Sequence, residues 1–186
     1  MKVILFLAAT TLATITIGWG DVMNIKSERP TAAPDGTFPK LTASNLQKQT
    51  FSLPEDFAGD RNLLLIAFQR EQQQNVDTWL HQMKRFEVSP GFQYYELPTI
   101  DRLSPIFRWF INSGMRRGIP DRNARARTIT LYLDMPAFRK ALNIPDEKRI
   151  YAILVDRSGR VLWRAEGDFD EAKATSLQAA LIAGKQ

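Results

Sequence analysis

The sequence predicts an α/β fold in which a mixed sheet is flanked by helices. Three observations predict it. Residues 63–68 form a short apolar run, typical of a strand covered on both faces, and the apolar period then changes to that of a helix. Candidate strands and helices alternate along the middle of the chain. The turn Asp156–Gly159 then predicts an antiparallel hairpin, which a last helix follows.

The strand and helix between residues 62 and 86 organise the expected domain. Leu63–Phe68 is the strand. The helix carries apolar residues on one face, which are Val76, Trp79, Leu80, Met83 and Phe86. A buried strand that enters a helix through a short polar turn opens a βαβ unit, and functional residues often lie at that turn. Here the turn is Arg70–Gln74, which contains neither a glycine loop for phosphate nor a cysteine.

The next elements follow from local patterns. Leu41–Leu53 alternates weakly and predicts a short hairpin or edge strand before the central strand. Phe92–Leu97 alternates and is aromatic, so it predicts a second strand, which we expect Pro98 to end. A helix is predicted from Ser104, as its N-cap, to Gly114, with a proline at the first helical position.

The second half of the chain completes the pattern. Asp134 and Asp170 are each predicted to cap a helix, because aspartate accepts hydrogen bonds from free backbone N–H groups at a helix start. Asn143 is expected to end the first of these helices. The expected elements are the strands Thr128–Leu133, Ile150–Asp156 and Val161–Glu166 and the helices Pro136–Leu142 and Glu171–Ile182.

Composition limits the chemistry. With 186 residues and 44% hydrophobic residues, the chain has about one domain's worth of core-forming sequence. It has no cysteine, which excludes disulfides, thiol redox chemistry, thiolate metal sites and lipid attachment through cysteine. The single histidine, His81, falls between the apolar positions of its helix and is expected to face solvent. We therefore predict no catalytic, metal or cofactor-binding residues.

The first forty residues predict a targeting segment and a linker. Residues 1–20 carry one lysine and then apolar and small residues, a length between a signal-peptide core and a membrane span. We interpret them as a signal peptide or membrane anchor; a buried N-terminal helix is the alternative. Residues 21–40 are polar and contain three prolines, so they are expected to be a linker before a domain at 41–186. The protein is expected to be exported, either periplasmic or anchored to an inner membrane.

Positive charge is concentrated in one segment. Between residues 101 and 127 lie two aspartates and seven arginines, which are Arg102, Arg108, Arg116, Arg117, Arg122, Arg125 and Arg127. Seven minus two is +5, which equals the formal net charge of the whole chain. We expect residues 116–127 to form a basic loop. Such a segment favours an acidic partner, an anionic membrane surface or nucleic acid, and nucleic acid is disfavoured because no recognised binding motif accompanies the cluster.

The helix at residues 104–114 adjoins this basic segment and is apolar over more than a narrow stripe. It either packs in the core or exposes an apolar surface, flanked by arginines, that suits lipid or a membrane-embedded partner. Aromatic side chains would then contact apolar helix surface, and arginines would contact carboxylates or lipid phosphates. The candidate partner-binding residues are Phe107, Trp109, Phe110, Arg116, Arg117, Arg122, Arg125 and Arg127.

The element order, with a parallel start, a closing hairpin and a final helix, describes a thioredoxin-like sheet. The segment FPKLTASNLQKQTFSLPEDFAGDRNLLLIAF is similar to the lead-in of peroxiredoxins and TlpA-type thioredoxins, and ITLYLDMPAFRKALNI resembles their later strand and helix. In that superfamily a Cys-x-x-Cys motif would fall near residues 73–76, which read Gln-Gln-Asn-Val here. Neither a dithiol nor a peroxidatic thiolate can form.

A narrower resemblance covers roughly residues 38–181. WFINSGMRRGIPD and YAILVDRSGRVLWRAEGDFDEAKATSL resemble the ATPase-complex assembly-factor ten family, with the MRRGIPD and LVDRSGRVLWRAEG stretches the most specific. The resemblance implies a cysteine-less thioredoxin-like protein without enzymatic activity that contacts a hydrophobic subunit of ATP synthase. That family belongs to the mitochondrial inner membrane, whereas the leader of this chain is of a bacterial, export-directed type.

Two classes of function follow. The first is a non-catalytic, membrane-associated binding or assembly factor, which could serve a membrane complex such as ATP synthase. The second is a thiol-independent enzyme that uses the Arg70–Gln74 turn, with Glu71 as an acid or base. A lipid- or nucleic-acid-binding module that uses the basic segment is the remaining alternative. Partner identity and oligomeric state are not predicted by the sequence.

Overall fold

The computed structural model describes residues 36–183. The expected signal or anchor segment at 1–20 lies outside the described residues, as do residues 21–35 of the expected linker. The packed domain begins before the expected boundary at Leu41. Phe38 is only 1% exposed, and its backbone N–H donates to the Gly159 carbonyl. The last residues of the expected linker therefore belong to the domain.

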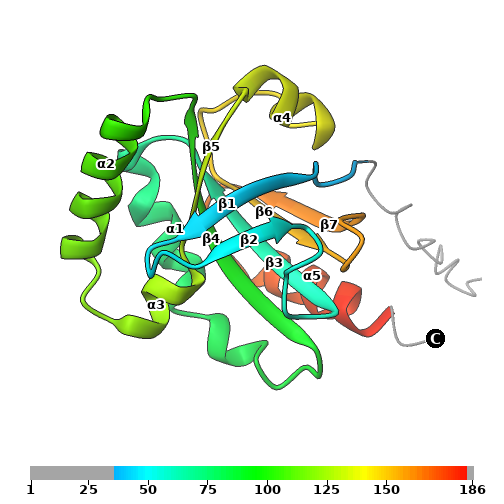
Figure 1. Cartoon of the computed structure of the whole chain (residues 1–186). Helices are drawn as coiled ribbons and strands as arrows, with labels where there is room; N and C mark the ends of the chain where they lie inside the picture. The colour runs from blue at the N-terminus through cyan, green and yellow to red at the C-terminus, as the bar shows by residue number, and fades with distance from the viewer. Residues whose placement is uncertain (1–35, 184–186) are drawn as a thin grey trace, which may run out of the picture. The chain divides into compact units, whose positions relative to one another are not determined.

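Seven strands of the described chain form one mixed sheet (Figure 1), which confirms the predicted fold class. The sheet order is β2-β1-β5-β4-β3-β6-β7. Strands β3, β4 and β5 are parallel, whereas the β1–β2, β1–β5, β3–β6 and β6–β7 pairs are antiparallel. The strands are β1 Leu41–Asn45, β2 Thr50–Leu53, β3 Arg61–Ala67, β4 Phe92–Asp101, β5 Ile129–Leu133, β6 Tyr151–Val155 and β7 Val161–Glu166.

Helices lie on both faces and at one end of this sheet (Figure 1). Two short 3₁₀ turns, η1 and η2, precede and follow α1. The bounds are η1 Arg70–Gln72, α1 Gln73–Leu80, η2 Met83–Arg85, α2 Pro105–Gly118, α3 Arg122–Arg127, α4 Met135–Ala141 and α5 Glu171–Ala183. In the described residues no helix combines the length and the apolar character needed to cross a bilayer.

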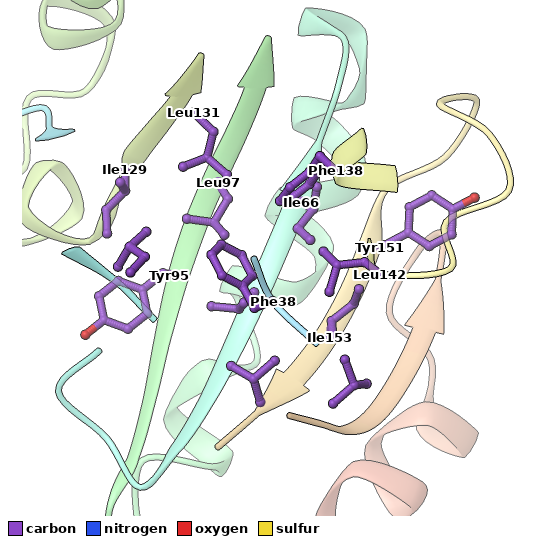
Figure 2. Packing of buried hydrophobic residues seen from close by; sticks show 14 of the residues in the cluster. Phe38, Ile66, Tyr95, Leu97, Ile129, Leu131, Phe138, Leu142, Tyr151 and Ile153 are labelled. Atoms are coloured by element: carbon purple, nitrogen blue, oxygen red, sulfur yellow. The ribbon is translucent and has the colours of Figure 1, made fainter. Parts of the chain in front are cut away.

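The core has two layers, one on each face of the sheet. On one face Ile66 of β3 packs with Phe138 and Leu142 of the α4 region, as Figure 2 shows. On the other face Leu65 packs with Trp79 of α1, and the Trp79 indole N–H donates to the Gly167 carbonyl at 2.9 Å. Alternate residues of β3 thus serve opposite layers, which explains why its sequence is continuously apolar.

Two expected element ends are wrong. The predicted helix through Phe86 ends at Leu80, where the backbone changes to i→i−3 hydrogen bonds such as Gln82 N–H to Trp79 C=O at 2.9 Å. The apolar positions that follow still face the core. The predicted second strand does not end at Pro98 but continues to Asp101. Its continuous pairing with β3 ends at Pro98 and its continuous pairing with β5 begins at Thr99, after an isolated bridge between Glu96 and Thr128. The proline therefore lies at the end of one run of pairing, next to the start of the other.

The closing hairpin and the helix caps are confirmed. Gly159 has a φ of +85° in the turn between β6 and β7, a left-handed conformation that glycine adopts without a steric penalty. The Asp134 carboxylate accepts from the Ala137 N–H at 2.9 Å at the start of α4, and Asn143 has a φ of +50° after its end. The Asp170 carboxylate accepts from the Lys173 N–H at 2.8 Å at the start of α5.

Candidate partner-binding surface

Helix α2 is longer than the sequence predicted. It starts after Ser104 with Pro105 in its first turn, as expected, and continues through Gly114 to Gly118. Gly114 does not adopt a positive φ, so it does not end the helix and acts only as a weak helix former within it. Arg116 and Arg117 therefore lie in the last helical turn rather than in a loop. The remaining part of the expected basic loop is also largely helical, because it forms α3.

The apolar face of α2 points to solvent. Its four large side chains are about equally exposed: Ile106 63%, Phe107 60%, Trp109 60% and Phe110 59%. The Trp109 and Phe110 rings meet edge to face, with centroids 5.0 Å apart. Of the two alternatives for this helix, exposure is correct and burial in the core is wrong. We call Ile106, Phe107, Trp109 and Phe110 the α2 apolar face.

The opposite side of α2 attaches the helix to strand β5 through polar contacts. The Tyr132 hydroxyl of β5 lies 3.0 Å from the Asn112 side-chain oxygen, to which it donates. The Arg108 guanidinium stacks over the Tyr132 ring at 5.0 Å from its centroid and donates to the Leu103 carbonyl at 2.7 Å. Figure 1 shows α2 and α3 on the side of the sheet where β1 and β5 lie. These contacts orient the helix and leave its apolar face uncovered by the described chain.

The arginines after the α2 apolar face lie in helices and form no salt bridges within the described residues. Asp121 caps α3 by accepting from the N–H groups of Asn123 and Ala124 at 3.2 and 2.9 Å, and these bonds lower the pKa of its carboxyl. None of the five candidate arginines forms a salt bridge within residues 36–183. Arg117 and Arg122 are exposed, and Arg116 and Arg125 are half-buried.

Arg127 lies apart from the other four. Its guanidinium stacks over the Tyr94 ring at 4.4 Å from the centroid, and its Nε is buried without a hydrogen-bond partner among the described residues. It also interacts with the carboxylate of Glu96. Since the ring and this carboxylate occupy the Arg127 side chain, the outward-facing cations are Arg116, Arg117, Arg122 and Arg125. We call these four the α2–α3 arginines.

Two residues beside these arginines were missed by the sequence analysis. Gln47 and Lys48 belong to the turn between β1 and β2, which the sheet order places near α3 because β1 pairs with β5. The Gln47 side chain donates to the Arg122 carbonyl at 2.6 Å. No local signal could have found this contact, because 75 positions separate the two residues.

The Arg70–Gln74 turn is structural in this arrangement. Gln72 is 5% exposed, and its side-chain oxygen accepts from the N–H groups of Phe68 and Gln69 at 2.8 and 3.3 Å. Its side-chain nitrogen donates to the Glu147 carbonyl at 2.8 Å. Glu71, the candidate acid or base, is exposed to solvent.

A buried carboxyl group lies beneath the first turn of α1, where the superfamily motif would fall. Glu96 of β4 is 7% exposed, and burial raises the pKa of its carboxyl. Hydrogen bonds from Gln73 and Thr128 and the charge of Arg127 oppose that rise, whereas the nearby Asp77 carboxylate adds to it. In the part of the chain that the structure describes, no group of three or more acidic or histidine side chains could hold a metal ion.

Comparisons with known proteins bear on the fold of this chain. No family model matches the sequence, and no curated protein matches it. Solved structures do match. A protein described as a thioredoxin from Neisseria meningitidis is 16% identical with a TM-score of 0.53, over 82% of this chain and 94% of that one.

The fold is thioredoxin-like. A thiol:disulfide interchange protein from Bacteroides sp. is 19% identical with a TM-score of 0.54, over 83% of this chain and 93% of that one. A member of the Sco family of cytochrome c oxidase assembly proteins is 12% identical with a TM-score of 0.52, over 80% of this chain and 95% of that one. At these identities the likeness establishes the thioredoxin-like fold alone. In this chain that fold carries no cysteine.

Proposed function

We propose that this thioredoxin-like protein is a non-catalytic binding factor that holds a membrane protein against the α2 apolar face. The observation that carries the proposal is the exposure of four large apolar side chains, at 59–63%, on one helix. Contiguous exposed apolar patches on soluble domains mark interaction sites. An apolar helix of a membrane protein is the occupant that this face suits, because aromatic side chains gain most from contact with apolar surface.

The α2–α3 arginines favour the same kind of occupant. They follow the α2 apolar face along the chain and form no salt bridge within the described residues. Guanidinium groups bind carboxylates and phosphates through paired hydrogen bonds, so the expected partner carries acidic groups next to its apolar segment. A partner at a bilayer surface offers both, from its own side chains or from anionic lipids.

Resemblance supports an assembly role. The MRRGIPD stretch, which resembles the ATPase-complex assembly-factor ten family, forms the α2–α3 junction and thus lies within the proposed surface. One structural neighbour belongs to a family of cytochrome c oxidase assembly proteins. We therefore propose assembly of a membrane complex, with the membrane sector of ATP synthase as the first candidate. In this proposal residues 1–20 direct export or anchor the domain at the outer side of an inner membrane.

Co-purification from native membranes tests the proposal. The wild-type protein, cross-linked to its surroundings, is expected to retain a specific integral membrane protein that mass spectrometry identifies. Replacing Arg116, Arg117, Arg122 and Arg125 with serine should abolish that association. The matched control replaces Arg70, Arg149, Arg157 and Arg160 with serine, which removes the same charge from other surfaces and should leave the association intact. Undiminished association in the first variant would contradict the proposal.

A further inference from the structure

A shallow basic hollow lies where the β1–β2 turn meets the junction of α2 and α3. Its volume is about 330 Å³, and its lining residues come from the β1–β2 turn and from the consecutive helices α2 and α3, which lie far from that turn in the sequence. They are Leu46, Gln47, Lys48, Arg116, Arg122 and Arg125. Four of these six side chains are cations. We call this feature the basic hollow.

The β1–β2 turn holds its residues in a fixed conformation. Asn45 is 4% exposed, and its side-chain oxygen accepts from the N–H groups of Gln47 and Gln49 at 3.0 and 2.9 Å. Its side-chain nitrogen donates to the Ala126 carbonyl at 3.0 Å, which ties the turn to the end of α3. Lys48 has a φ of +69°, a conformation that residues other than glycine rarely adopt. The lysine is therefore placed at the edge of the hollow by a well-bonded turn.

Charge in the basic hollow is not balanced by the protein. Lys48, Arg116, Arg122 and Arg125 contribute four positive charges, and none of them forms a salt bridge within the described residues. Asp121 is the acid that interacts with Arg125, but its two oxygens already accept from the backbone of α3. Four charges minus one leaves +3. Repulsion among neighbouring cations is relieved when an anion binds between them.

We propose that the basic hollow binds a phosphate group. Guanidinium groups match phosphate oxygens in paired hydrogen bonds, and a lysine ammonium adds a compact point charge, so this combination of side chains suits phosphate. The volume lies near the lower end of the range for small-molecule sites, which suits a small phosphate or a lipid headgroup rather than a large cofactor. This inference goes beyond the proposed function, because it requires no partner protein.

The experiment measures binding to the folded domain in two arms. In the first, sodium pyrophosphate is titrated at constant ionic strength into ¹⁵N-labelled protein. Saturable shifts are expected at the amides of residues 46–48, 116 and 122–125. In the second, flotation compares vesicles of phosphatidylglycerol with vesicles of phosphatidylcholine. Saturation by pyrophosphate alone assigns a soluble phosphate, and flotation only with phosphatidylglycerol assigns a lipid headgroup; either result supports the proposal.

Variants separate this site from general charge and from the α2 apolar face. The double variant Lys48→Gln, Arg122→Gln is expected to raise the dissociation constant about tenfold or more, since it removes charged hydrogen bonds to the phosphate. The matched control Lys84→Gln, Arg70→Gln, which removes the same charge from exposed positions elsewhere, should leave it unchanged. The Trp109→Ser variant should bind phosphate as the wild type does, even though its binding to the membrane protein is expected to be weaker.

Two results would overturn the inference. One is the absence of saturable binding in both arms, with pyrophosphate and with phosphatidylglycerol vesicles. The other is an equal loss of affinity in the double variant and in its charge-matched control, which would mean that only the overall charge of the domain matters. Thermal unfolding of each variant checks that the domain remains folded. The membrane-protein proposal is tested separately, because it rests on the α2 apolar face, which the Trp109→Ser variant alters and the Lys48→Gln, Arg122→Gln variant does not.

Discussion

Replacing Trp109 with serine should weaken partner binding without unfolding the domain. An aromatic side chain buries about 150–250 Å² when fully covered. With 60% of Trp109 exposed, docking can bury roughly 120–150 Å² more of it, which at about 25 cal/mol per Å² is worth ~3 kcal/mol. Ordering of the interface offsets part of this gain. We therefore expect the dissociation constant to rise about 10- to 100-fold.

The same substitution should hardly change the stability of the domain. Exposed side chains contribute little to folding, and the edge-to-face contact with Phe110 is worth only about 0.5–1.5 kcal/mol. The assay measures how much of the cross-linked membrane protein is captured as the bait concentration rises. Val88→Ser is the matched control, because Val88 is 80% exposed but lies between η2 and β4, away from α2. An unchanged capture curve for Trp109→Ser, or an equal loss for Val88→Ser, would refute the reasoning.

Three further predictions concern the domain itself. Gln72→Ala should lower the free energy of unfolding by about 1–3 kcal/mol in urea denaturation, because it leaves partly buried backbone groups without their side-chain partner. Gly159→Ala should cost about 1–3 kcal/mol in the same assay, because φ is +85° and the new Cβ would lie 2.8 Å from Pro54 Cγ. Glu96→Gln should alter the pH dependence of stability. Burial raises the folded pKa of Glu96 above its ordinary 4.5, so the wild type loses stability as pH rises from about that value toward the raised one. Over that pH window the melting temperature of the variant should rise relative to that of the wild type. A difference in melting temperature that does not change with pH would contradict the burial argument.

Local patterns were sufficient to predict most of the fold. The apolar run of β3, the turn before β7 and the aspartate caps are each determined by neighbouring residues, and the structure has them where they were expected. Pro98 was misjudged because the local rule ends a strand at proline. The strand continues beyond that residue because it pairs with β5 there, and this pairing depends on the sheet order, which local sequence patterns do not determine.

The candidate site was predictable only in part. The composition of α2 was visible in the sequence, but the same apolar residues would serve a buried or an exposed helix, and packing against Tyr132 decides between them. Arg127 could not be separated from the other arginines, because its contact with Tyr94 joins α3 to β4. Lys48 lay outside the basic segment altogether and is brought to it by the pairing of β1 with β5.

Photo-cross-linking in native membranes tests the central claim most directly, which is that the α2 apolar face of this cysteine-free domain holds a membrane protein. A photoreactive phenylalanine is placed at Phe110 in one variant and at Val88 in another. We predict that the probe at Phe110 labels one integral membrane protein and that the probe at Val88 does not. Labelling of lipid alone from Phe110, or the same products from both positions, would contradict the account.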